Sequence, residues 1–108
     1  MKRGDIVIAA EKSRVGGKPR PWLIVQSDAF NETHASVTVC MISANAPDIG
    51  LFRLAIDPSN TNGLAEPSTI FIDVLLSVSR RSIHRVVGRA DRATMTSVDA
   101  ALKRWLNL

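Results

Sequence analysis

Three kinds of side chain that can act on a phosphodiester stand near the ends of short apolar segments. Arg20 lies just before one such segment, Ser43 just after another, and Asp73 near the end of a third. Guanidinium and hydroxyl groups donate hydrogen bonds to phosphate oxygens, and a carboxylate can accept a proton, so the set could hold and polarise a phosphodiester. Each residue also has a structural interpretation. Arg20 could pair with Asp5, Ser43 could bond its own backbone, and Asp73 could cap an element or form a salt bridge.

Metal, thiol and nucleotide-cofactor chemistry have no support in the sequence. A zinc site needs three or four ligands at compatible spacing, whereas His34 lies in a polar stretch and His84 lies beside an arginine. Cys40 stands in an apolar run, which is typical of a buried, unreactive thiol. The glycines at 16–17 are followed by Lys-Pro and not by a helix, unlike a phosphate-binding loop. We therefore expect neither a metal nor a cofactor.

The elements that must position these residues are predicted by the apolar pattern. Short β-branched or apolar segments bounded by turn residues predict strands at 6–10, 22–26, 37–42, 52–56, 69–74 and 84–89. Asp91 is then a candidate N-cap for a helix whose apolar residues recur at helical spacing: Met95, Val98, Leu102, Trp105 and Leu106. The pattern predicts a mainly β fold, with a small, curled antiparallel sheet closed by one C-terminal helix.

Two connections stand out in this pattern. The stretch from Arg14 to Pro21 is rich in glycine, proline and basic residues, and predicts a mobile basic loop. The stretch from Asp57 to Pro67 contains Asp-Pro and Asn-Gly turn signals and predicts a second irregular segment.

Length, composition and charge narrow the class of protein. The 108 residues, 45% hydrophobic and 22% charged, fit one compact domain that spans residues 1–108. The apolar stretch at 6–10 is too short for a signal-peptide core or a membrane span, so we expect a cytoplasmic protein that does not bind membranes. A formal net charge of +4 favours a polyanionic partner, although many small domains carry such a charge only for solubility.

Several short motifs occur along the chain in a recognisable order. The chain opens with Lys2-Arg3-Gly4-Asp5-Ile6-Val7, and its most specific segment is Arg20-Pro21-Trp22-Leu23-Ile24-Val25-Gln26-Ser27-Asp28. Met41-Ile42-Ser43, Gly88-Arg89 and a closing helix with Val98, Asp99, Ala101, Leu102, Trp105 and Leu106 follow. This succession covers nearly the whole chain and resembles the MazF/PemK family of toxins.

The resemblance implies an SH3-like barrel of the CcdB/PemK kind with a C-terminal helix. It also implies the toxin of a type II toxin–antitoxin system: a homodimeric, sequence-specific, ribosome-independent endoribonuclease that cuts single-stranded RNA without a metal and so inhibits translation and growth. Matched position by position, Arg20 corresponds to the family's catalytic arginine, Ser43 to its catalytic Thr or Ser, and Asp73 to a carboxylate that some members use as a base.

The corresponding mechanism needs no metal. The 2′-hydroxyl attacks the phosphorus, Arg20 contacts the scissile phosphate and aids the leaving oxygen, Ser43 donates a hydrogen bond, and Asp73 helps to activate the 2′-hydroxyl. The expected products carry a 2′,3′-cyclic phosphate and a 5′-hydroxyl.

The expected partners are RNA and a cognate antitoxin. The expected RNA-binding residues are Arg14, Lys18, Arg20, Arg80 and Arg81, although the last two could equally belong to a solvated face. An acidic, largely disordered, MazE-like antitoxin segment is expected to cover the same face as the RNA.

Some positions depart from the family pattern and keep alternatives open. Phe71 stands where the family often has an arginine, and Leu76-Ser77 replaces a basic residue and a threonine. The loop before Arg20 is short and lacks the histidine or glutamate of some members. A non-catalytic barrel that binds nucleic acid or protein is therefore one alternative. A CcdB-like gyrase inhibitor is another, but its closing Trp-Gly-Ile is absent from the C-terminal Trp105-Leu106-Asn107-Leu108.

Overall fold

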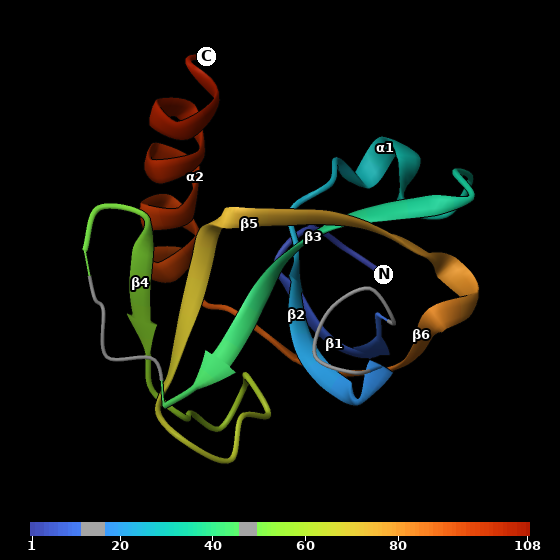
Figure 1. Ribbon diagram of the computed structural model, residues 1–108, viewed down its shortest axis with the longest axis horizontal. Helices are drawn as coiled ribbons and strands as arrows, with labels where there is room; N and C mark the ends of the chain where they lie inside the picture. The colour runs from blue at the N-terminus through green and yellow to red at the C-terminus, as the bar shows by residue number, and fades with distance from the viewer. Residues whose placement is uncertain (12–16, 46–49) are drawn as a thin grey trace.

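The computed structural model describes residues 1–11, 17–45 and 50–108. The strands are β1 (Asp5–Ala10), β2 (Pro19–Ile24), β3 (Ser36–Ala44), β4 (Arg53–Ile56), β5 (Ser68–Ser79) and β6 (Ile83–Arg89), and the helical elements are α1 (Asp28–Asn31), η2 (Arg80–Ser82) and α2 (Arg92–Leu106). The strands form one antiparallel sheet in the order β4-β5-β3-β2-β1-β6. The mainly β fold with a closing helix is thus confirmed (Figure 1).

The long strand β5 gives the sheet its curl. It pairs with β4 at its start and with β3 along its length, and the β3–β5 register shifts between Cys40 and Met41. Such a bulge bends a strand and increases its twist, and β5 turns across the molecule in Figure 1. β5 also continues past the predicted end at residue 74, because its second half pairs with β3 from Ser36 to Cys40.

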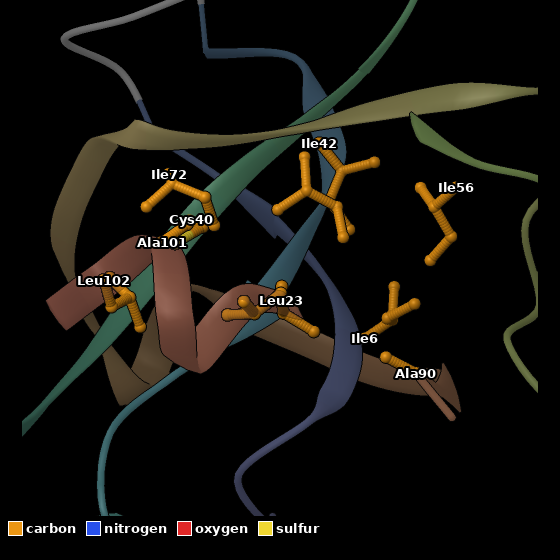
Figure 2. Close-up of a cluster of buried hydrophobic side chains, with 11 residues drawn as sticks. Ile6, Leu23, Cys40, Ile42, Ile56, Ile72, Ala90, Ala101 and Leu102 are labelled. Carbon is orange, nitrogen blue, oxygen red and sulfur yellow. The ribbon is translucent and has the colours of Figure 1, made fainter. Parts of the chain in front are cut away.

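The larger of two apolar clusters lies between the sheet and α2. It combines Ile6 and Leu23 with residues of β3 and β5 and with the helix residues Val98, Ala101 and Leu102 (Figure 2). Cys40 belongs to it and is fully buried, and this burial raises the pKa of its thiol to about 12. The predicted burial of Cys40 is confirmed, and a buried thiol with a raised pKa is a poor nucleophile.

The predicted helix is confirmed as α2. The Asp91 carboxylate accepts a hydrogen bond from the backbone N–H of Thr94 at 2.8 Å, which also holds the pKa of Asp91 below its ordinary value. Val98 and Leu102 are buried as expected, while Trp105 and Leu106 remain about half exposed. None of the described helices is long and apolar enough to cross a membrane.

The second apolar cluster lies on the other face of the sheet. It contains Trp22, Met41 and Phe71, together with residues of β1 and the first half of β3. The indole N–H of Trp22 donates to the carbonyl of Ala9 at 3.1 Å, so the polar atom of this buried ring is satisfied. The two clusters show that β2, β3 and β5 are buried on both faces.

The predicted basic loop is shorter than expected at its C-terminal end. Pro19 and Pro21 lie in β2, where they pair with Ala10 and Ile8 of β1. Proline has no N–H to donate. Because β2 pairs with β3 only from Trp22 onward, both prolines lie in the part of β2 that has no ladder to β3, where a missing N–H breaks no hydrogen bond on that side. Arg14 lies outside the described residues.

Candidate active site

A cleft of about 480 Å³ opens where β1, β2 and β3 meet the β4–β5 connection. Its polar side chains include Lys18, Arg20, Ser43 and Glu66, and apolar residues such as Ile8 and Val87 also line it. The structure therefore brings together two of the three predicted catalytic residues, Arg20 and Ser43, with the predicted RNA-binding residue Lys18.

The arrangement of β2 and β3 explains why Arg20 and Ser43 line the same cleft. The β2–β3 ladder runs from the Trp22–Met41 pair to the Ile24–Val39 pair, and Arg20 and Ser43 each lie two residues beyond its Trp22–Met41 end. Both side chains therefore stand at the same end of the ladder, where they can contact one phosphate group together.

Arg20 has no competing partner among the described residues, where its guanidinium forms neither a salt bridge nor a hydrogen bond. The alternative pairing with Asp5 does not occur, because the Asp5 carboxylate accepts instead from the backbone N–H of Lys2 at 2.9 Å. The guanidinium is thus available to an anion. The Ser43 hydroxyl donates to the carbonyl of Ala44 at 3.0 Å, a local bond that a phosphate oxygen could replace.

Asp73 does not line this cleft. On β5, Thr69 is the residue opposite Ser43, and Asp73 stands four residues further, about 13 Å along an extended strand. Its two carboxylate oxygens accept from Nε and Nη2 of Arg53, each at 2.9 Å. The hydrogen bond to Arg53 is the main reason that the pKa of Asp73 lies below its ordinary value. A carboxylate with both oxygens engaged and a lowered pKa is a weak base, which argues against the predicted role of Asp73.

The Arg53 guanidinium also lies over the Phe71 ring, 4.3 Å from its centroid. Arg53 and Phe71 are direct partners in the β4–β5 ladder, and Asp73 is the diagonal neighbour. The family pattern often places an arginine at position 71, and here a guanidinium reaches the same neighbourhood from the adjacent strand. Together, Arg53, Phe71 and Asp73 form a packed unit on the sheet.

We predict that Asp73→Asn destabilises the fold by about 1 kcal/mol at pH 7 and leaves most of any cleavage activity intact. Because the folded pKa of Asp73 is lowered, its stabilisation is fully present above the unfolded pKa of about 3.9 and is lost as the pH falls through the folded value. Urea unfolding at several pH values should show the difference between the two proteins shrinking below about pH 4. Loss of cleavage in a folded variant would restore Asp73 as the base.

The other predicted RNA-binding arginines lie in a different part of the molecule. Arg80 donates to the Glu32 carbonyl at 2.6 Å and contacts the Glu32 carboxylate at 3.4 Å. The N-terminal amine also binds this carboxylate and is the main cause of its lowered pKa. Arg81 is exposed and, with Arg80 and Arg85, lines a second cleft that shares no residue with the first. The structure thus separates Arg80 and Arg81 from Arg20.

Glu66 is the functional candidate that the sequence did not indicate. Among the described residues that line the cleft, it is the only carboxylate. It comes from the irregular stretch between β4 and β5, where the sequence showed only turn signals. Nothing in the local pattern connects this loop with Arg20. Elsewhere in the described ranges, no group of three or more His, Cys, Asp or Glu residues is arranged to hold a metal.

Nearly the whole chain matches a known family. A family model described as "PemK-like, MazF-like toxin of type II toxin-antitoxin system" matches residues 2–106. The chain belongs to this toxin family. The predicted resemblance to MazF/PemK toxins is therefore confirmed, and with it the general function of the chain as a MazF-like toxin.

Individual relatives support this membership. The chain is 41% identical over 108 residues to the "Probable endoribonuclease MazF" of Mycolicibacterium smegmatis, covering 100% of this chain and 98% of that one. It is 27% identical over 92 residues to "Endoribonuclease MazF6" of Mycobacterium tuberculosis, covering 84% and 81% of the two chains.

Solved structures share the fold at lower identity. A mycobacterial endoribonuclease solved in complex with its cognate antitoxin has a TM-score of 0.82 at 24% identity, over 100% of this chain and 96% of that one. The Mycobacterium tuberculosis toxin MazF-mt6 has a TM-score of 0.80 at 22% identity, over 96% and 97%. These similarities confirm the predicted barrel with its C-terminal helix.

Proposed function

We propose that this MazF-like toxin is a sequence-specific endoribonuclease that cleaves single-stranded RNA, including mRNA, independently of the ribosome. One observation carries the proposal: the guanidinium of Arg20, which has no partner among the described residues, and the hydroxyl of Ser43 line one open cleft in a chain that matches the family model over residues 2–106. The names of its relatives, which include a probable endoribonuclease 41% identical over the full chain, support the same activity.

The proposed reaction is an internal transfer at phosphorus. The 2′-oxygen forms a bond to phosphorus, the bond to the 5′-oxygen breaks, and the products carry a 2′,3′-cyclic phosphate and a 5′-hydroxyl. The transition state places added negative charge on the phosphate oxygens and the leaving oxygen. Arg20 can donate two N–H groups to these oxygens and Ser43 one O–H, so both stabilise charge where it develops.

The proton of the 2′-hydroxyl must leave during this step. Because the Asp73 carboxylate is held by Arg53, we assign Asp73 to positioning Arg53 and propose that water in the open cleft accepts the proton. Water also returns a proton to the 5′-oxygen. Arg20 remains charged throughout, since a guanidinium is not deprotonated in proteins.

We expect cleavage to proceed in the presence of EDTA, because Arg20 and Ser43 supply the charge stabilisation that a metal would otherwise provide. A long unstructured RNA incubated with the purified protein and chelator should be cut at short, recurring sequences. End mapping should find cyclic phosphates and 5′-hydroxyls. Complete loss of cleavage on chelation, restored by a divalent cation, would contradict the proposed mechanism.

We further propose that the toxin binds a cognate antitoxin through an acidic, largely disordered segment that occupies the Lys18–Arg20 face. The family description names a type II toxin–antitoxin system, and a toxin of the same fold was solved with its antitoxin. We also propose a homodimer. The apolar side chains of Leu106 and Leu108 are about 48% and 85% exposed at the end of α2 and could be covered by a second copy.

RNA and the antitoxin are expected to compete. Lys18→Glu should weaken both complexes, because the same cationic face serves both ligands. Fluorescence anisotropy of a labelled RNA with a 2′-deoxy residue at the cut site measures RNA binding without cleavage, and added antitoxin should release the RNA. Simultaneous binding of both ligands would rule out direct occlusion.

A further inference from the structure

The connection between β4 and β5 is held as a rigid wall of the cleft. Asn62 is buried at its centre, and its side-chain oxygen accepts from the backbone N–H groups of Ser59 and Leu64 at 3.1 and 3.0 Å. Its amide nitrogen donates to the carbonyl of Asp57 at 2.8 Å. The Asn62 side chain therefore bonds to backbone groups that precede and follow it in the loop, and these bonds hold the two parts of the loop together.

The same loop is fastened to β6. The backbone N–H of Arg89 donates to the carbonyl of Thr61 at 2.8 Å. A Cβ atom on Gly88 would lie 2.4 Å from that carbonyl oxygen, and Gly63 adopts a positive φ of 72° against the backbone of Val87. Contacts this close allow no side chain between the loop and the strand.

The fastened loop presents Glu66 to the cleft. Gly63, Leu64, Ala65 and Glu66 line one wall, facing a cleft that also contains Lys18 and Arg20. Pro67 disfavours a helical backbone at Glu66, and the Ser68 hydroxyl donates to the Glu66 carbonyl at 2.9 Å. The backbone of Glu66 is thus ordered, while its side chain remains exposed.

A carboxylate in this place does not serve phosphate binding. The backbone of RNA is anionic, so a negative charge beside Lys18 and Arg20 lowers affinity for every sequence alike. A carboxylate becomes favourable only where it accepts hydrogen bonds from the ligand. In single-stranded RNA the donors are the 2′-hydroxyls, which are the same at every nucleotide, and the base edges, which differ between bases and can offer two donors side by side.

On the basis of the proposed RNA cleavage, we propose that Glu66 is a specificity-determining residue that recognises a guanine next to the scissile phosphate. The exposed edge of guanine offers two parallel donors, N1–H and the N2 amino group, which match the two oxygens of a carboxylate. Cytosine and adenine each offer only one amino group on that edge. Asn62 and Gly88 act as positioning residues, since they hold the loop that carries Glu66.

The test is to map the cleavage sites of the whole protein and of Glu66→Gln on a random-sequence RNA pool. The wild-type protein should require guanine at one position beside the cut. Glu66→Gln should lose this preference and cut sequences with other bases there, while cutting the best wild-type sequence more slowly. Replacing that guanine by inosine, which lacks the N2 amino group, should slow the wild-type enzyme by on the order of tenfold to a hundredfold and the variant much less.

Asp57→Asn is the matched control, because Asp57 is an exposed carboxylate of the same loop that does not line the cleft. It should leave the cleavage motif unchanged. An unchanged motif in Glu66→Gln would overturn the inference while leaving the proposed nuclease intact. Equal loss of cleavage on all sequences would also overturn it, by identifying Glu66 as a base. A wild-type protein that cuts no RNA would instead refute the proposed function itself.

Discussion

Arg20→Ala is expected to slow RNA cleavage by about a hundredfold or more, because it removes a donor placed where negative charge develops in the transition state. The loss should appear mainly in kcat, since Arg20 stabilises the transition state more than the bound RNA. Stability should change little, because among the described residues no hydrogen bond or ion pair depends on this guanidinium. Single-turnover cleavage and urea unfolding measure the two quantities separately.

Two further variants sharpen this result. Arg20→Lys keeps the charge but loses the planar pair of donors, so it should recover only part of the rate. Arg104→Ala removes an exposed arginine from α2, outside both clefts, and should cut RNA at the wild-type rate. Normal cleavage by a folded Arg20→Ala protein would move the active site elsewhere.

The strands and the C-terminal helix were predictable because their signals are local. Alternating or continuous apolar segments bounded by turn residues located all six strands, and Asp91 marked the start of α2. The length of β5 was not predictable in this way. Its second half, from Leu75 to Ser79, is a strand because it pairs with β3, and that pairing is set by the fold and not by the residues themselves.

The site was predictable in part. Arg20 and Ser43 were selected as candidates from motif positions, and the structure places both at the Trp22–Met41 end of the β2–β3 ladder, where they line one cleft. The partner of Asp73 could not be predicted, since Arg53 is twenty residues away in sequence and meets it only across the β4–β5 ladder.

Longer-range contacts were also hidden. Arg80 and Glu32, which are 48 residues apart, form a contact that no local pattern reveals. Glu66 was missed for a similar reason, because an irregular loop has no periodicity that would show which of its side chains face the cleft. Asn62 and Gly63 looked like an ordinary turn signal in the sequence, and only the packing against Gly88 shows that the turn shapes a cleft.

Gly88→Ala is expected to lower the free energy of unfolding by about 2–3 kcal/mol, as is typical of forced overpacking. The new Cβ atom would lie 2.4 Å from the Thr61 oxygen and from the carbonyl carbon of Asn62, and both are backbone atoms that cannot rotate away. The loop must therefore move off β6, which breaks or stretches the hydrogen bond from Arg89 to Thr61. Thermal unfolding should show a midpoint lower by roughly 10 °C.

Gly50→Ala is the matched control, because a Cβ atom at Gly50 would meet no atom within 4 Å. It makes the same chemical change without the collision, so it should leave the midpoint nearly unchanged. If Gly88→Ala were as stable as Gly50→Ala, the loop between β4 and β5 would be able to shift with little loss of folding free energy, and the description of a rigid wall would be wrong. Because the displaced loop carries Glu66, a destabilised but folded Gly88→Ala protein should also cut RNA with a relaxed sequence preference. A loss of stability without that relaxation would separate the packing of the loop from its role in recognition.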